Sequence, residues 1–492
     1  MISEKDKIQW LSWSKESFEK SKKENKPILL NLTAVWCHWC HVIKATTYSN
    51  DEVAAIINEG FVPVKVYIDQ HPDIRDRYNM GGFPSTVFLD SEGSIIIGET
   101  YVPPDKMKAL LSYVKSLYIK KDFRAPRQAE NLEKKQFEEL NESIIKEILV
   151  LIEGSFDSYY GGFGIQPKFP PYDVIDFLLD YYNKTKQKKY LDIALKTLDK
   201  MYEGIYDRIE GGFFRYSVTQ DWKVPHYEKM LETNAGLLRN YIRAFSITNN
   251  EDYKKIVEGI IDYINKNLKN YDGGFYGSHD ADEEYYQQDK EKRIAMKKPF
   301  IDKTVYTDWS SMMISAYIHA YKNLRSRELL DFALKSIEFQ IKNLYSKNYG
   351  MPHYFDGKAN GSGLLSDNIY FMNALLDAFE AAGDKKYLEI AEEISFFIIK
   401  KLYDSKNGGF FDRIKKENDI GMLNVRIKNF LENSFCAIGY LKLHKAAKKE
   451  EYKKIAEDAL KHCGNSYLDY GYFSAVYAGA LSLFFDKNQE LP

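Results

Sequence analysis

The chain has 492 residues, more than one ordinary hydrophobic core holds, so at least two domains are predicted. Its 69 basic and 71 acidic residues give a formal net charge of −2, which offers no electrostatic attraction for nucleic acid. Four cysteines are too few for a disulfide scaffold, no apolar run is long enough to span a bilayer, and the polar N-terminus lacks the apolar core of a secretory signal. We therefore expect a cytoplasmic protein with neither nucleic-acid nor membrane partners.

The pattern of apolar residues indicates an α/β domain over residues 1–122. Predicted strands cover 27–33, 61–68, 85–89 and 94–98. Predicted helices cover 14–25, the stretch after Cys37, 51–58, the stretch up to Tyr78, and 104–118. After the first helix the order is β-α-β-α-β-β-α, which is the layout of the thioredoxin fold.

The motif W-C-H-W-C-H lies where the first predicted strand is followed by a helix. The unpaired N–H groups and the dipole of a helix N-terminus lower the pKa of a thiol from its usual value of about 8.5. Cys37 is therefore predicted to be an exposed nucleophile, and Cys40, one turn into the helix, to be the resolving thiol that closes a disulfide. The predicted neighbours of these thiols are Trp36, His38, Trp39 and His41.

Two other chemistries fit the same residues. C-x-x-C-H is the attachment signature of c-type haem, which normally requires export, and the sequence shows no export signal. Zinc could use both thiols with His38 or His41, but a structural zinc site takes four ligands and the motif supplies only two sulfurs. The surrounding elements favour a redox site, and neither a metal nor another cofactor is expected.

The chain resembles a thioredoxin-domain family in the stretches C-H-W-C-H-V-I, S-N-D-E-V-A-A-I-I-N-E-G-F-V-P-V-K-V and H-P-D-I. The family includes bacterial YyaL-type proteins and the spermatogenesis-associated thioredoxin-like protein, and it joins a thioredoxin-like domain to a long helical region. The resemblance implies that Pro84 is the cis-proline facing the C-x-x-C motif. The segment before it departs from the family, because it is short and ends G-G-F-P instead of G-G-W-P. Asn31 stands where ordinary thioredoxins carry a buried Asp, and an amide cannot accept the proton of the resolving thiol, so slow disulfide reduction is expected.

A charged linker is predicted over 123–140, followed by a helical region over 141–492. Glycine- and aromatic-rich turns recur six times in that region, at 161–164, 211–214, 273–276, 349–354, 408–411 and 470–473. Two amphipathic helices lie between successive turns, which indicates an array of helical hairpins. The closed form of such an array is an (α/α)6 barrel, and an open solenoid is the alternative.

Unusual polar residues follow these turns, so we expect them to line one pocket at one end of the barrel. The predicted pocket residues are Lys168, Arg215, Trp222, His226, Glu228, Lys229, His279, Asp280, Asp282, Trp309, His353 and Asp367. P-K-F-P, P-H-Y-E-K-M-L-E-T-N-A and H-D-A-D-E-E resemble the family's helical region, which is similar to six-hairpin glycosidase and N-acylglucosamine 2-epimerase barrels. Paired carboxylates suit glycoside hydrolysis, and histidines suit proton transfer next to a sugar carbonyl.

Three functions remain open from the sequence. The first is a dithiol–disulfide oxidoreductase with a protein thiol or disulfide client. The second is a sugar epimerase or glycoside hydrolase that binds a small carbohydrate-like molecule and uses the thioredoxin unit as an accessory. The third is a non-catalytic binding scaffold, because fold alone does not decide function.

Overall fold

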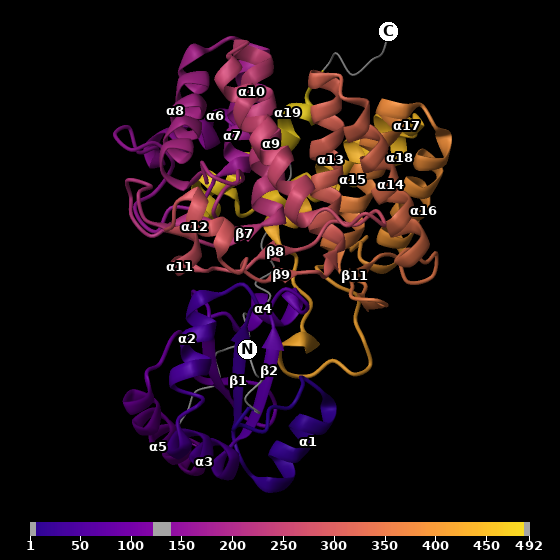
Figure 1. Cartoon of the computed structure of the whole chain (residues 1–492). Helices are drawn as coiled ribbons and strands as arrows, with labels where there is room; N and C mark the ends of the chain where they lie inside the picture. Colours follow the sequence, from indigo (N-terminus) through magenta and orange to yellow (C-terminus); the bar gives the residue numbers. More distant parts are fainter. Residues whose placement is uncertain (1–5, 122–138, 487–492) are drawn as a thin grey trace. The chain divides into compact units, whose positions relative to one another are not determined.

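The computed structural model describes residues 6–121 and 139–486 (Figure 1). The described residues fall into two compact units: the first takes those within Met1–Lys134 and Lys415–Arg426, and the second those within Lys135–Ile414 and Ile427–Pro492. Most of the predicted linker lies outside the described residues. Within the described ranges, no helix combines the length and apolar character needed to cross a membrane.

The first unit has a four-stranded sheet in the order β2-β1-β3-β4. Its strands are β1 (Ile28–Thr33), β2 (Val62–Tyr67), β3 (Ser85–Leu89) and β4 (Ile95–Glu99). Its helices are α1 (Lys15–Glu24), α2 (His38–Thr46), α3 (Asp51–Gly60), α4 (Pro72–Tyr78) and α5 (Pro104–Lys120). β1 runs parallel to β2 and antiparallel to β3, and its first five residues are buried, which explains why they are apolar except for Asn31. The predicted thioredoxin-like fold is confirmed.

The first unit also takes in a segment that the sequence assigned to the helical region. The short 3₁₀ helix η2 (Gly421–Asn424) packs on α4, where the Arg77 guanidinium donates to the Met422 and Val425 carbonyls at 3.1 and 2.8 Å. The Tyr78 hydroxyl accepts from the N–H of Met422 and donates to the carbonyl of Gly93, both at 2.8 Å. Polar backbone groups of the segment are thus satisfied by the thioredoxin-like fold.

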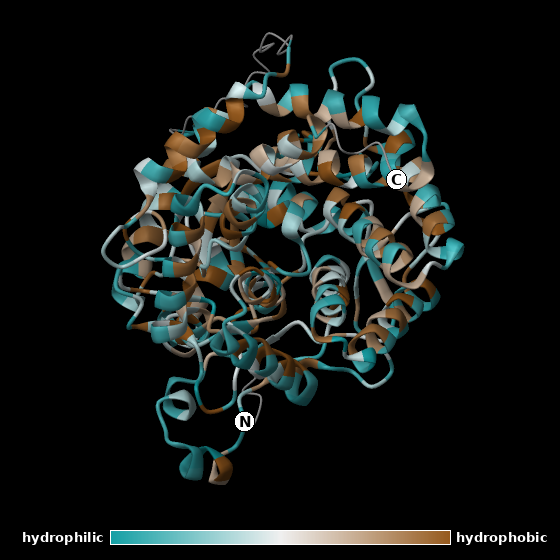
Figure 2. Ribbon diagram, turned by 90° about the horizontal axis from the view of Figure 1, so that it is seen from above, coloured by the Kyte–Doolittle hydropathy of each residue, from teal (hydrophilic) through white to brown (hydrophobic). Residues whose placement is uncertain are grey.

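The second unit contains two rings of helices, which Figure 2 shows as concentric. The inner helices are α7 (Tyr172–Thr185), α9 (Leu231–Thr248), α13 (Thr307–Leu324), α15 (Leu365–Ala382), α17 (Phe430–Ala447) and α19 (Ala475–Phe484). The outer helices are α6 (Ser143–Ser155), α8 (Lys188–Ile205), α10 (Glu251–Tyr263), α14 (Arg327–Asn343), α16 (Lys385–Lys401) and α18 (Glu450–Gly464). Each inner helix contacts the next and α19 contacts α7, so the ring closes. The predicted (α/α)6 barrel is confirmed, and the open solenoid is excluded.

The two ends of the barrel have different connections. Inner helices reach the next outer helix through short loops, several of which begin at a residue with left-handed backbone, such as Asn249 and Gly383. Outer helices return to inner helices through long segments that contain the glycine turns. These segments carry short elements: β5 (Tyr216–Ser217), β6 (Pro225–His226), β7 (Lys229–Met230), β8 (Ser278–His279), α11 (Glu283–Tyr286), α12 (Lys290–Ala295), β9 (Ile301–Asp302), β10 (Val305–Tyr306), β11 (Pro352–Phe355), β12 (Ala359–Ser362) and η3 (Tyr467–Ser474), with η1 (Ile264–Leu268) extending α10. All six glycine turns therefore belong to one end.

Three of the glycine turns are each held by a lysine, of which Lys168 and Lys229 are buried and Lys428 is partly buried. Lys168 reaches both Asp157 and the carbonyl of Gly161 at 2.6 Å, which ties the end of an outer helix to the turn. Lys229 does the same with Asp207 at 2.7 Å, and Lys428 with Asp404 at 2.8 Å. Corresponding turns of three hairpins thus share the same arrangement, in which a lysine pairs with an aspartate and also donates to a backbone carbonyl.

These contacts set the ionisation of the aspartates. Burial by itself raises the pKa of Asp404, but hydrogen bonds from Lys428 and Asn407 outweigh it and lower the pKa to about 2. In the same way, the Lys229 ammonium lowers the pKa of the buried Asp207 below its usual value. The aspartates therefore stay charged at neutral pH and hold their lysines.

An asparagine one turn into an inner helix fastens the aromatic residue of the turn. Asn234 accepts the N–H of Phe213 at 2.8 Å and donates to its carbonyl at 3.1 Å. Asn433 brackets Phe410 with contacts of 2.6 and 2.9 Å. Because a buried amide pairs with both backbone groups, each turn is fixed against the N-terminus of an inner helix.

Candidate functional site

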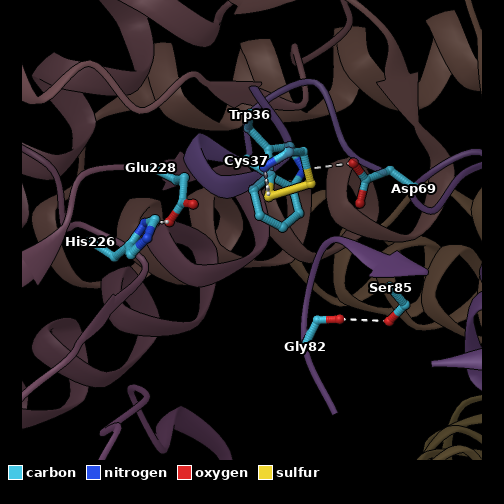
Figure 3. The surroundings of a disulfide bond; sticks show 8 residues. Trp36, Cys37, Asp69, Gly82, Ser85, His226 and Glu228 are labelled. Carbon is cyan, nitrogen blue, oxygen red and sulfur yellow. Dashed lines mark hydrogen bonds and ion pairs between the residues drawn. A yellow bond between two sulfur atoms is a disulfide. The ribbon is translucent and has the colours of Figure 1, made fainter. Parts of the chain in front are cut away.

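The C-x-x-C motif lies at the junction between β1 and α2. Cys37 is the N-cap residue of α2, with φ −90° and ψ 112°, and the N–H of Cys40 donates to its Sγ at 3.2 Å. The two cysteines form a disulfide with their Cα atoms 5.2 Å apart (Figure 3). The helix N-terminus therefore directs the N–H of Cys40 and its dipole at the sulfur of Cys37, which stabilises a thiolate when the bond is reduced.

The surface around the disulfide differs from the expectation. Cys37 and Cys40 are each only 4% exposed, so the predicted exposed nucleophile is buried in the oxidised protein. The reason is that its sulfur is turned into the first turn of α2, toward Cys40. Trp39 is instead 45% exposed, with its ring 5.1 Å from that of Tyr101.

The loop before β3 lies at the same edge of the sheet as the disulfide. Because β1 and β3 are antiparallel with Leu32 opposite Ser85, the end of β1 and the start of β3 are neighbours. The Phe83–Pro84 peptide is cis, as the resemblance implied, and the Ser85 hydroxyl donates to the carbonyl of Gly82 at 2.7 Å (Figure 3).

Sequence reasoning missed an acidic residue beside the motif. Asp69, 6% exposed, follows β2 and accepts a hydrogen bond from the Trp36 indole at 2.6 Å (Figure 3). The sequence could have predicted this position. Asp69 follows the strand parallel to β1, so it lies at the end of the sheet that carries the cysteines. Asn31, 4% exposed on β1, has an Oδ1 with no hydrogen-bond partner among the described residues.

In the barrel, the structure brings together His226 and Glu228. Nδ1 of His226 lies 2.8 Å from a carboxylate oxygen of Glu228, and both side chains are buried (Figure 3). The Tyr216 ring stacks on His226 at 4.8 Å, and Phe169, half exposed, stacks on Tyr216 at 4.6 Å. The Arg215 guanidinium lies 5.7 Å from both aromatic rings. These residues place a buried imidazole within ion-pair distance of a carboxylate and beside stacked aromatic rings.

A second histidine–carboxylate pair joins β11 and α15. Nδ1 of His353 lies 2.9 Å from Oδ1 of Asp367, and Asp308 on α13 is close to both. Burial raises the pKa of Asp367 to about 7, against the effect of the nearby His353 and with a contribution from the Asp308 carboxylate. Trp309 packs against Tyr306 at 4.6 Å beside this pair.

Several predicted pocket residues make contacts that hold the turns and helix ends of the barrel. Lys168 and Lys229 hold glycine turns, and Trp222 is fully buried with its indole donating to the carbonyl of Tyr160 at 3.1 Å. Asp282 is the N-cap of α11 and accepts from the N–H of Tyr285. The spacing of polar residues after each glycine turn does not distinguish residues that hold a turn from residues that line a pocket, because both kinds lie at the same end of the barrel.

His279 and Asp280 are adjacent but differ in environment. Nδ1 of His279 lies 3.2 Å from the Tyr263 hydroxyl, and burial together with the cations Lys229 and Lys298 lowers its pKa to about 3. It is therefore neutral at physiological pH. The backbone N–H of Asp280 donates to the carbonyl of Phe300 at 2.8 Å, and its side chain is half-buried.

The inner helices carry a further polar group that the sequence analysis did not assign. Asp173, in the first turn of α7, has 28% of its side chain exposed, and burial raises its pKa to about 7 despite Arg239. Arg239 pairs with Asp176 one turn further along α7. The sequence feature that could have revealed this group is the i, i+3 spacing of Asp173 and Asp176 on α7 together with Arg239 on α9. This spacing places the two aspartates on the same face of their helix.

The fold and site define a thioredoxin-like domain with an intact C-x-x-C disulfide, joined to an (α/α)6 barrel. The family Thioredox_DsbH, described as a protein of unknown function, DUF255, matches residues 2–144. Over 89% of its length the chain is 25% identical to human spermatogenesis-associated protein 20, of which the match covers 73%. Residues amounting to 18% of the chain are 30% identical to disulfide bond reductase DsbH of Chlamydia pneumoniae, covering 58% of that protein. The resemblance predicted from the sequence is confirmed.

The barrel resembles solved sugar-enzyme structures in fold. Cellobiose 2-epimerase from Spirochaeta thermophila superposes with a TM-score of 0.57 at 13% identity, covering 73% of this chain and 98% of the epimerase. At such low identity the likeness establishes the fold of the barrel and no more.

Proposed function

We propose that this protein is a thiol–disulfide oxidoreductase, and the observation that carries the proposal is the Cys37–Cys40 disulfide at the N-terminus of α2. In the reduced protein, the Cys37 thiolate attacks a client disulfide, forms a mixed disulfide and releases one client thiolate. Cys40 then attacks the Cys37 sulfur, which releases the second client thiolate and leaves the disulfide seen here. Two electrons pass from the dithiol to the client, and a donor dithiol restores the starting state.

The surroundings support client binding beside the sulfur. Trp39 offers an exposed aromatic surface next to the motif, and the cis-Pro84 loop lies at the same sheet edge. In this arrangement an extended client segment would pair with the backbone of the loop before β3, because β3 itself is flanked by β1 and β4. The match to disulfide bond reductase DsbH supports the same chemistry.

The proposal is tested by alkylating the reduced, folded protein at neutral pH and locating the label by mass spectrometry. Cys37 should react well before the other thiols. Cys436 and Cys463 are matched internal controls, since both are fully buried and burial raises their thiol pKa, to about 12 for Cys463. Labelling of all four cysteines at one rate would contradict the proposal.

Two variants separate the roles of the motif cysteines. Cys40→Ser should accumulate a mixed disulfide with a model disulfide substrate, because the resolving thiol is missing. Cys37→Ser should form none, although its fold is unchanged by circular dichroism. If both variants trapped equal amounts of mixed disulfide, the assignment of the attacking sulfur to Cys37 would be wrong.

A second function, on a carbohydrate, is favoured by the His226–Glu228 pair and its aromatic face. Glu228 lies within ion-pair distance of the His226 imidazole, a group suited to proton transfer, and the Phe169 and Tyr216 rings offer the kind of surface on which a sugar ring stacks. Incubation with mono- and disaccharides in D2O should give deuterium at the carbon next to the carbonyl, for an epimerase, or new reducing ends, for a hydrolase. His226→Asn should abolish the signal, whereas the matched change His444→Asn on α17 should not.

A further inference from the structure

Three metal-ligand side chains converge from separate parts of the barrel. Asp308 is in the first turn of α13, His353 is on β11, and Asp367 is in the first turn of α15. Each offers one ligand atom, and these atoms all lie within 4.8 Å of one another. Among the residues that the structure describes, no other group of three His, Cys, Asp or Glu side chains has this spacing.

The distance within the cluster fits coordination. Ligand atoms bound at about 2.1 Å to one ion, at angles between octahedral and tetrahedral, lie about 3.0–3.4 Å apart. Nδ1 of His353 and Oδ1 of Asp367 are 2.9 Å apart, a hydrogen-bond contact just below this range, which binding would exchange for two bonds to the ion; the other separations are at most 4.8 Å. Asp308 is half-buried, so its side chain has room to complete the set.

The second observation is an unsatisfied oxygen. Asp367 is completely buried, and its Oδ2 makes no hydrogen bond of ordinary geometry among the described residues, although the backbone N–H of Asp308 lies near the carboxylate. An unpaired buried carboxylate oxygen is costly, and the Asp308 carboxylate nearby adds repulsion. A cation at this position would satisfy the oxygen and remove the repulsion between the two carboxylates.

We propose that Asp308, His353 and Asp367 bind a first-row divalent cation such as Mn²⁺ or Zn²⁺. One imidazole with two carboxylates suits these ions better than Ca²⁺ or Mg²⁺, which prefer oxygen ligands alone. The charges of two carboxylates balance a dication, and three protein ligands leave a position for water or a bound molecule. Tyr306 and Trp309 pack around the cluster, with the Tyr306 ring 5.8 Å from the imidazole.

The test uses the full chain with Cys37→Ser and Cys40→Ser, so that the thiols of the C-x-x-C motif bind no metal; the remaining Cys436 and Cys463 are buried. After treatment with EDTA, Mn²⁺ is titrated and followed by the electron paramagnetic resonance signal of the free ion, and Zn²⁺ bound after dialysis is measured by elemental analysis. One equivalent of cation per chain is expected. Asp308→Asn and Asp367→Asn should each weaken binding at least about tenfold.

The matched control is Glu228→Gln, which alters the other buried histidine–carboxylate pair and should leave binding unchanged. If Asp367→Asn does not fold, Asp308→Asn decides the question, because the Asp308 side chain is only partly buried; circular dichroism checks that this variant is folded. Absence of bound cation in the parent protein would overturn the proposal. So would unchanged affinity in folded Asp308→Asn, or loss of binding in Glu228→Gln.

Discussion

The lysines of the glycine turns allow a graded stability prediction, made by replacing each with Met. Removing one partner of a buried ion pair costs about 3–5 kcal/mol, because the other charge remains buried. Asp157 would keep only neutral donors, the Gln220 amide and backbone N–H groups, so Lys168→Met should cost about 3 kcal/mol. Asp207 would keep Arg293 at 2.8 Å, which should limit the cost of Lys229→Met to about 2 kcal/mol.

The third site sets the lower end of the series. The Lys428 and Asp404 side chains are 12% and 15% exposed, so water can solvate the aspartate once the lysine is gone. Lys428→Met should therefore cost only about 1 kcal/mol. Urea unfolding followed by far-ultraviolet circular dichroism, which reports mainly the helical barrel, measures the series.

A double variant separates lost charge from lost packing. Asp157→Asn with Lys168→Met removes both charges at similar volume and should recover at least half of the stability lost in Lys168→Met. The reasoning is refuted if Lys428→Met destabilises as much as Lys168→Met. It is also refuted if the double variant is no more stable than the single one.

Four further predictions concern other parts of the chain. Asn31→Asp should speed reduction of a model disulfide by the pre-reduced protein; an unchanged rate would mean that another group accepts the proton of the resolving thiol. Because the folded pKa of Asp404 is lowered to about 2, its contribution to stability is complete above its ordinary pKa near 4 and is lost as the pH falls toward 2; Asp404→Asn should flatten this part of the unfolding profile, and a profile like the parent's would contradict it. Gly211→Ala should destabilise the barrel by more than 1 kcal/mol, since φ is +78° and the added Cβ would lie 2.3 Å from the carbonyl oxygen of Gly259; a neutral effect in urea would show that the turn can move. Tyr78→Phe should raise hydrogen exchange in 415–426, because it leaves the N–H of Met422 without its acceptor, and unchanged exchange would mean that other contacts hold the segment.

The sequence by itself determined the main helices and strands and the thioredoxin-like fold, and it left a closed barrel and an open solenoid as alternatives for the array of hairpins. Apolar runs such as Ile28–Thr33 and the alternation of hairpins with glycine turns depend on local periodicity, which burial on one or two faces imposes. The position of Cys37 at a helix N-terminus followed in the same way, from a strand directly before a helix.

Only the tertiary structure decided what each polar side chain does. Lys168, Lys229 and His226 all follow glycine turns, but the lysines are bound to turn carbonyls and aspartates, whereas the histidine faces Glu228 and a stacked tyrosine. Asp308, His353 and Asp367 are separated by up to 59 positions in the sequence and converge because neighbouring inner helices begin at the same end of the ring. The sequence pattern specifies that end of the barrel, but the direction of a side chain depends on long-range packing, which local periodicity does not encode.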